Sequence, residues 1–378
     1  MKTISFYAKS FDEFEQRLNK EISNAGFKPT LAFAFVSVEF PIKKVSSAFK
    51  KHDILLFGET SSGEILFNEN EKEVLNKSAV FILTDIDPAG FSSRLFEREG
   101  KNSFDFGKEI GTFIKGAFDK PSVIIGGSGL DLDGQRLVEG IKSVAGTDLV
   151  MFGGLAGDDG KFQQTFVFNE TTVSDNGTMA LIFDSSKIQL SGIATSGWVG
   201  LGMNLIITKS EGNVVYTIND KAALDVYLEY LSISIDDMPA IGLEYPLLIK
   251  RENNIDALRA VTGIDKEKRS LLFAGSVPQG STVMFSSSPG FDVIESTKSK
   301  VLAFAENNPD ADMFLLFSCI ARHLALGPMV EEEINLITEK WNAPVAGFFT
   351  YGEIGTNPGK VCDFYNQTYT LVSLKDLA

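Results

Sequence analysis

Hydrophobic and polar residues in the first half of the chain alternate between short apolar runs and stretches with helical spacing. Residues 3–8 and 31–38 are apolar runs of strand length. Between them, Ser10 and Glu13 form a capping box, and apolar residues from position 11 to 25 recur at the intervals of an amphipathic helix. The same alternation predicts further strands at 54–57, 79–84, 91–98, 123–125 and 149–152 and helices at 43–52, 103–118 and 134–144.

The second half begins with consecutive strands and then returns to mixed structure. Short apolar runs separated by turns predict strands at 166–168, 179–183, 188–193, 205–208 and 214–218. Helices are predicted at 221–231, 291–306 and after Pro328, and strands at 247–250, 271–274, 282–285, 313–317, 345–349 and 364–374. We therefore predict an α/β protein of the mixed α+β kind, with stacked, largely antiparallel or mixed sheets flanked by helices.

Two of the predicted strands continue into the same Gly-x4-Gly-Glu-Ile pattern, at 58–65 and 347–354. A shorter relative, GGLAGDD, follows the strand that ends at residue 152. Glycine permits a close backbone approach where a buried strand ends, and such turns direct N–H groups outward, beside the acids that follow. The turns predict either a pocket for a ligand with both signs of charge or structural turns with solvated acids. The repeat also predicts two pseudo-related halves.

Composition excludes several classes of function. The 378 residues include 35 basic and 50 acidic side chains, a net charge of −15, which repels nucleic acids and anionic lipid surfaces. No apolar run reaches the length of a membrane helix, so we expect a soluble, cytoplasmic protein. Two cysteines and two histidines exclude a disulfide framework and much of metalloenzyme chemistry. The 31 phenylalanines predict a thick core or an aromatic-lined cavity.

Seven segments together resemble the FIST family, a sensory domain of signal-transduction proteins. They cover nearly the whole chain: GETSSGEI (58–65), GGLAGDDGKFQQTFVF (153–168), GWVGLG (197–202), AALDVYLEYL (222–231), FSCIARHLALG (317–327), PVAGFFTYGEIG (344–355) and FYNQTYTLVSL (364–374). The resemblance implies a FIST N-like domain at 1–190, a FIST C-like domain at 191–378 and a small ligand such as an amino acid. No output segment is attached, so the resemblance also implies a separate partner, of the histidine kinase, cyclase or chemotaxis type. Where the family often has a second arginine, this chain has His323.

The matched segments imply a set of ligand-binding residues, several with a structural alternative. Arg322 would clamp a carboxylate with two parallel hydrogen bonds, or would form a structural salt bridge. Glu353 would hold an ammonium group and Tyr351 would supply a hydroxyl, or the carboxylate would stabilise its turn. Trp198 would be a stacking lid or a core residue. The predicted set is Ser61, Ser62, Gly63, Glu64, Gly154, Asp158, Trp198, Cys319, Arg322, Tyr351, Gly352 and Glu353.

Three other functions remain open at the level of sequence. Cys319 and His323 would share a helical face, but a thiolate nucleophile needs accessible, electropositive surroundings, which the end of an apolar strand does not offer. No catalytic residue and no enzyme activity are therefore predicted, with Cys- or Ser-dependent chemistry as the alternative. A haem-binding nitric-oxide sensor would use His323 as its axial ligand. A ligand-free interaction scaffold is the third alternative. No metal site is predicted, because no regular ligand spacing follows Asp158 and Asp159.

Overall fold

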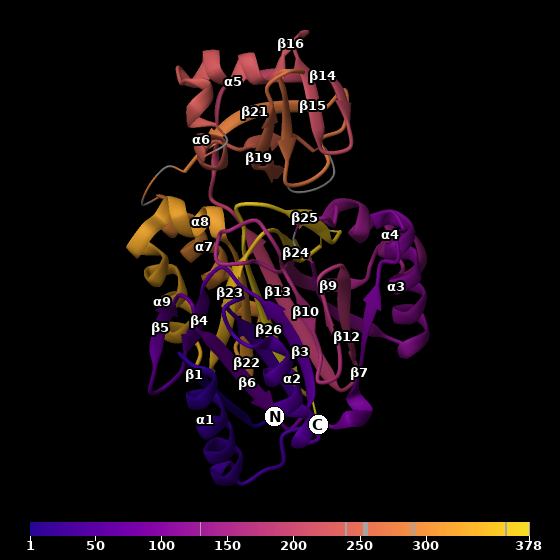
Figure 1. Cartoon of the computed structure of the whole chain (residues 1–378). Helices are drawn as coiled ribbons and strands as arrows, with labels where there is room; N and C mark the ends of the chain where they lie inside the picture. Colours follow the sequence, from indigo (N-terminus) through magenta and orange to yellow (C-terminus); the bar gives the residue numbers. More distant parts are fainter. Residues whose placement is uncertain are drawn as a thin grey trace.

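The protein consists of a large body and a small lobe that stands on one end of it (Figure 1). The computed structural model describes residues 1–128, 130–238, 240–251, 256–288, 290, 292–359 and 361–377. Both chain termini lie at the end of the body opposite the lobe (Figure 1), where the amino terminus is 3.5 Å from Asp376. Within these ranges, no helix combines the length and the apolar character needed to cross a membrane.

The body is built from three units that repeat one order of strands and helices. The first unit contains β1 (Thr3–Ala8), α1 (Phe11–Asn24), β2 (Leu31–Val36), α2 (Ile42–Lys51), β3 (Leu55–Thr60) and β6 (Ala79–Thr84). The second contains β7 (Phe91–Glu97), α3 (Ser103–Ala117), β8 (Pro121–Gly127), α4 (Gly134–Ala145), β9 (Val150–Leu155) and β12 (Gly177–Asp184). The third contains β13 (Ile188–Thr195), α7 (Asp292–Asn307), β22 (Met313–Cys319), α8 (Ile320–Leu326), α9 (Val330–Lys340), β23 (Val345–Thr350) and β26 (Tyr369–Asp376).

The strands of each unit pair in the same way. In the first sheet β2 lies between parallel β3 and antiparallel β6, and β1 pairs with the other side of β6. The second sheet repeats this order with β9, β8, β12 and β7, and the third with β23, β22, β26 and β13. The mixed α+β class with mixed and antiparallel sheets is thus confirmed. The prediction of two related halves is corrected, because the body contains three units of the same topology. The repeat in the sequence did not reveal the second unit as an equal member, since its turn, residues 153–159, lacks the Gly-Glu-Ile sequence.

Each sheet is completed by a hairpin that comes from another unit. The pair β4 (Glu64–Phe67) and β5 (Lys72–Leu75) leaves the first unit and extends the third sheet beside β23. The pair β24 (Glu353–Gly355) and β25 (Asp363–Tyr365) leaves the third unit and extends the second sheet beside β9. The pair β10 (Val167–Phe168) and β11 (Val173–Ser174) leaves the second unit and extends the first sheet beside β3. The exchange is cyclic, so the three units interlock.

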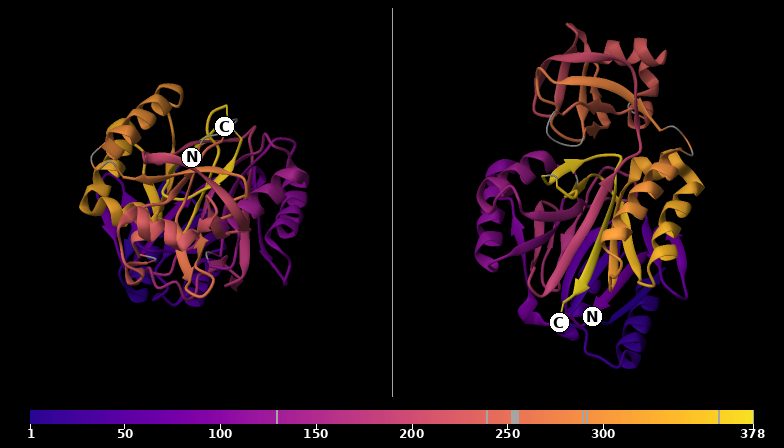
Figure 2. Two further views of the ribbon diagram at one scale, coloured as in Figure 1. Left: turned by 90° about the horizontal axis from the view of Figure 1, so that it is seen from above. Right: turned by 180° about the vertical axis from the view of Figure 1, so that it is seen from behind.

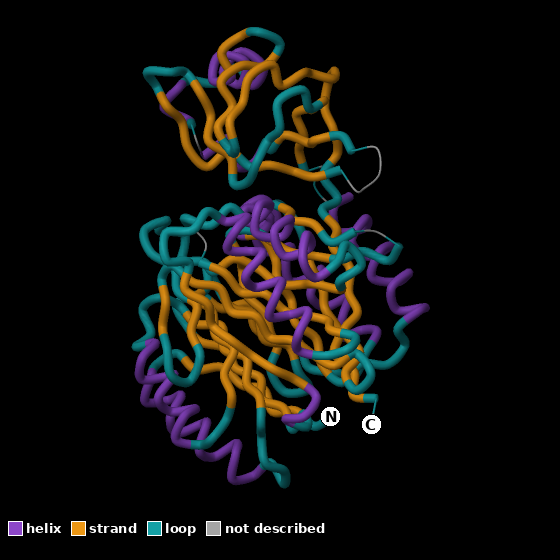
Figure 3. Tube along the Cα trace, turned by 90° about the vertical axis from the view of Figure 1, so that its right-hand side faces the viewer, coloured by secondary structure: helices purple, strands orange, loops and turns teal. Residues whose placement is uncertain are grey.

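The apolar residues of the strands fill the space between the three sheets, while the helices lie on the outside of the body (Figure 3). The central cluster includes Phe35 of the first sheet, Phe152 of the second and Phe348 of the third. The rings of Phe35 and Phe348 are stacked with centroids 4.7 Å apart. Strands such as β2 are buried along their whole length because helices cover the outer face of each sheet. Much of the phenylalanine content therefore serves the core.

The small lobe interrupts the third unit between β13 and α7 (Figure 2). Its elements are β14 (Val199–Glu211), β15 (Val214–Ile218), β16 (Lys221–Ala222), α5 (Ala223–Leu231), α6 (Ala240–Glu244), β17 (Leu247–Ile249), β18 (Ala257–Arg259), β19 (Val261–Asp265), β20 (Ser270–Phe273) and β21 (Thr282–Ser287). The strands form an antiparallel sheet in the order β18-β17-β21-β14-β15-β20-β19, with β16 beside β15. The sheet packs against α5, where the ring centroids of Tyr227 and Phe285 are 4.7 Å apart. The sequence predicted several of these elements, but not that they form a separate lobe. Residue 291, the predicted start of the next helix, lies outside the described residues.

Gly153 allows β9 to pass close to β8. Its φ angle is 145°, and a Cβ atom there would lie 1.9 Å from the backbone oxygen of Ile125. We expect Gly153→Ala to lower the free energy of unfolding by about 3 kcal/mol or more, because the backbone of a central strand would have to move. Urea denaturation measures this loss. Gly160→Ala is the control, since Gly160 has a φ of 75° but open space around it, and it should cost about 1 kcal/mol. Equal losses in the two variants would contradict the steric argument.

Candidate functional site

The three glycine-containing turns meet at the end of the body that faces the small lobe. Each turn donates at least one backbone hydrogen bond to the end of a strand in another unit. The N–H of Ser62 donates to the oxygen of Phe349 (3.0 Å), the N–H of Tyr351 to Leu155 (3.0 Å), and the N–H of Gly157 to Thr60 (2.8 Å). These bonds form a closed cycle between units. The structure therefore brings residues 58–65, 153–159 and 345–354 together, as the common strand-end position of the motifs predicts.

The two glutamates of the repeated motif are fully buried and hydrogen-bonded to the protein. Glu64 accepts hydrogen bonds from the hydroxyl of Ser61 and from the N–H (3.2 Å) and hydroxyl (2.6 Å) of Ser78. Glu353 accepts from the hydroxyl of Thr350, three residues earlier as Ser61 is, and from the N–H of Thr368 at 3.1 Å. Burial raises the pKa of Glu64 to about 8 and also raises the pKa of Glu353. In this arrangement both carboxyl groups close their turns and are hydrogen-bonded within the protein.

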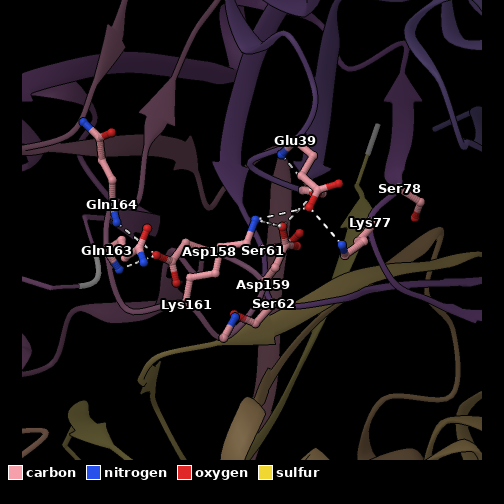
Figure 4. A network of polar contacts seen from close by, with 12 residues as sticks. Glu39, Ser61, Ser62, Lys77, Ser78, Asp158, Asp159, Lys161, Gln163 and Gln164 are labelled. Atoms are coloured by element: carbon pink, nitrogen blue, oxygen red, sulfur yellow. Dashed lines mark hydrogen bonds and ion pairs between the residues drawn. The ribbon is translucent and has the colours of Figure 1, made fainter.

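Asp158 holds the loop that follows the second turn (Figure 4). One of its oxygens accepts from the N–H of Phe162 at 2.8 Å and from the hydroxyl of Tyr351, and the other accepts from the N–H groups of Gln163 (2.6 Å) and Gln164 (2.9 Å). This carboxylate fixes the ring of Phe162 against Tyr351, with centroids 4.5 Å apart and planes 7° apart. In the part of the chain that the structure describes, no three His, Cys, Asp or Glu side chains gather as metal ligands would.

The guanidinium of Arg322 lies near both connections between the body and the small lobe, the one that leads into the lobe and the one that returns to the body. It donates to Glu333 on α9 (2.8 Å from Nε) and to the hydroxyl of Thr297 on α7 (2.8 Å), the helix that follows the lobe. It also donates to the backbone oxygen of Ser196 in the segment that leads into the lobe, and its Cζ lies 5.3 Å from the ring centroid of Trp198. Arg322 is fully buried. The structure therefore shows the salt bridge, and the side chain of Trp198 lies in the core with it.

Cys319 and His323 are held by packing. Burial and the nearby charge of Glu353 raise the pKa of the Cys319 thiol, which favours the protonated, unreactive form. The ring of His323 lies flat against Phe349, with centroids 3.9 Å apart, and burial lowers its pKa. The raised thiol pKa of Cys319 and the stacking of His323 on Phe349 both favour structural roles for these side chains.

A pocket of about 380 Å³ lies between the body and the small lobe. It is one of several depressions on the described residues, and its walls come from both the body and the small lobe. The lining residues of the body are Leu130, Asp131, Leu132, Asp133, Phe162 and Tyr351, and those of the lobe are Asn213, Thr262, Phe273, Ala274 and Gly275. A small ligand of the size of an amino acid fits a space of this volume.

Of the predicted site residues, Tyr351 is the one that lines this pocket. Seven of the others lie in the interior and are each less than 5% exposed: Ser61, Ser62, Glu64, Asp158, Cys319, Arg322 and Glu353. Gly63 has a φ of 114° at its turn, and Gly154 and Gly352 pack so closely that a Cβ would meet Thr350 and Phe364. Sequence reasoning missed Phe162, Asp131 and the lobe residues. The signal for Phe162 was its place inside the segment 153–168, three residues after Asp159.

Polar contacts join the lobe to the body around the pocket. Arg259 of β18 is fully buried and donates to the backbone oxygen of Phe364 (3.2 Å) and to the side chain of Gln135 (2.8 Å). The hydroxyl of Ser276 donates to Asp133 at 2.8 Å, and Arg259 has a pKa lowered to about 10 by burial. These hydrogen bonds contribute to fixing the orientation of the lobe on the body.

Comparison with known proteins places most of the chain in two family models. A model described as the FIST N domain matches residues 30–221, and a model described as the FIST C domain matches residues 223–356. The boundary between the two matches falls inside the small lobe, at the start of α5. No curated protein matches the chain.

Proposed function

Because this chain belongs to the FIST family of sensory domains, we propose that it is a sensory module. In this proposal it binds a small polar ligand, such as an amino acid, between the body and the small lobe. The observation that carries the proposal is the pocket whose walls come from the body and the small lobe. These walls include Tyr351, which lies in the glycine-containing turn of the third unit. The interlocked turns beneath it support the proposal, because they form a rigid floor with few groups left to rearrange.

The signal in this proposal is a change in the position of the small lobe. A ligand that contacts the body and the small lobe stabilises the orientation of the lobe in which both sets of contacts are made. It shifts the population of lobe orientations only as far as its affinity differs between them. The segments that connect the lobe to the body meet at Arg322, so movement of the lobe is passed to α7 and α9 through Thr297 and Glu333. The output would be a separate cytoplasmic protein of the histidine kinase, cyclase or chemotaxis type. The buried Cys319 supports a role without catalysis.

A thermal-shift screen of the twenty amino acids tests the proposal. A ligand present at 100 times its Kd should stabilise the folded protein by about 2.7 kcal/mol. Thr262→Trp, which places a large ring at an exposed pocket position, should abolish the shift. Thr112→Trp introduces the same ring at an exposed position on α3 and should preserve it. A shift that survives Thr262→Trp would count against this site, and the absence of a shift with every amino acid in the unmodified protein would count against amino acids as its ligands.

A further inference from the structure

Phe162 and Tyr351 form the aromatic wall of the pocket, and Phe162 has an unusual backbone conformation. Phe162 has a φ angle of 52°, in the left-handed region that bulky side chains rarely adopt, and its side chain is 47% exposed. One face of its ring is stacked on Tyr351, and its N–H is held by the buried carboxylate of Asp158. The ring is therefore fixed in place at the pocket and is not a freely moving surface side chain. An exposed, oriented ring is suited to stacking with a flat group or to contact with a cation.

The charged side chains that line the pocket are both acidic. The carboxylate of Asp133 accepts hydrogen bonds from the N–H of Arg136 at 3.1 Å and from the hydroxyl of Ser276 at 2.8 Å. Asp131 is an exposed residue at the same wall, and its backbone oxygen, not its carboxylate, accepts a hydrogen bond from Arg98. Asp131 therefore adds a negative charge to the pocket lining, which also includes Phe162, while the guanidinium of Arg98 lies on its backbone oxygen.

The nearest buried cation, Arg259, is engaged with neutral protein groups. Its donors reach the backbone oxygens of Ser276 (3.2 Å), Leu258 (2.9 Å) and Phe364 (3.2 Å) and the side-chain oxygen of Gln135 (2.8 Å). It lies behind the backbone of Gly275, where a Cβ would meet its Nε at 3.0 Å. A ligand carboxylate in the pocket would therefore face Asp131 and Asp133 without a basic side chain in the lining. Such an arrangement disfavours an anion and favours a cation.

From this lining we propose that the ligand is an organic cation with a flat or apolar body, which stacks on Phe162 and directs its ammonium or amidinium group to Asp131. The inference rests on the proposed function, since it concerns the same pocket, but it narrows the ligand class. An amino acid brings a carboxylate into an acidic lining, whereas an amine or amidine of the same size does not.

Isothermal titration calorimetry with matched compounds tests the proposal on the whole chain. Phenylethylamine, phenylalanine and 3-phenylpropionate share one ring and differ in charge, and tryptamine and benzamidine extend the cation series. We expect at least one cation to bind at least tenfold more tightly than phenylalanine, and 3-phenylpropionate to bind most weakly. Asp131→Asn should weaken the binding of that cation about tenfold. Asp119→Asn, which removes an equal charge at an exposed turn after α3, should leave it unchanged.

A second variant tests the aromatic wall. Phe162→Leu keeps an apolar side chain on the loop but removes the ring, and it should weaken cation binding several-fold. If amino acids bind and Thr262→Trp blocks them, but no cation binds more tightly, the sensing pocket stands and the ligand class proposed here is wrong. The same conclusion follows if a cation binds equally well to Asp131→Asn. If neither the amino acids nor the cations bind, both proposals fail.

Discussion

Replacing Arg322 by alanine should lower the free energy of unfolding by about 3–5 kcal/mol. Arg322 and Glu333 are both fully buried and joined by two contacts, from Nε at 2.8 Å and from Nη2. Without the guanidinium, the carboxylate of Glu333 keeps the hydroxyl of Thr297 (2.7 Å) as a hydrogen-bond donor but has no opposite charge. An ionised carboxylate left in such surroundings costs several kcal/mol. Urea denaturation of the whole chain measures the loss.

Two control variants separate the buried pair from a general effect of removing a positive charge. Lys375→Ala removes an exposed ion pair with Asp310 (3.1 Å) and should cost less than 1 kcal/mol. The double variant Arg322→Met with Glu333→Leu replaces both charges by apolar groups and should recover most of the loss. If Arg322→Ala were no more destabilising than Lys375→Ala, the pair would not be holding the junction between body and lobe.

Much of the local structure could be predicted because its determinants lie close together in the sequence. The helix predicted from Ser10 begins at Phe11, and the hydroxyl of Ser10 accepts a hydrogen bond from the N–H of Glu13. The region 364–374 shows the limit. It was predicted as one strand, but it forms β25 and β26 in two different sheets, separated at Gln367 with a φ of 59°. No glycine or proline marks that turn, so only the exchange of hairpins between units reveals it.

The location of the turns could also be predicted, whereas the surroundings of their side chains could not. The repeated Gly-Glu-Ile pattern indicated that strand ends gather, and they do. The pattern does not show that Glu64 is enclosed with Ser78, or Glu353 with Thr368, because those partners come from other strands. The pocket depends on even more distant segments, since residues 130–133 belong to the body and residues 213 and 262 belong to the small lobe.

The buried carboxyl of Glu64 should make the stability of the protein fall as the pH rises. Its pKa is near 4.5 when unfolded and about 8 in the folded protein, because burial disfavours the charge. The folded state therefore holds a proton that the unfolded state releases between these values. The stabilisation is present below about pH 4.5 and is lost progressively up to about pH 8. At about 1.4 kcal/mol per pH unit, this one group accounts for a loss of about 5 kcal/mol.

Glu64→Gln tests this prediction, because glutamine keeps a polar group beside Ser61 and Ser78 but cannot ionise. The free energy of unfolding, measured by urea denaturation from pH 5 to 9, should decline less steeply for Glu64→Gln than for the unmodified protein. The difference between the two curves should grow with pH in favour of the variant, and Glu306→Gln at an exposed position on α7 should show no such growth. Parallel curves for Glu64→Gln and the unmodified protein would mean that Glu64 is already ionised in the fold. Its turn would then be able to offer a charge to a ligand after all.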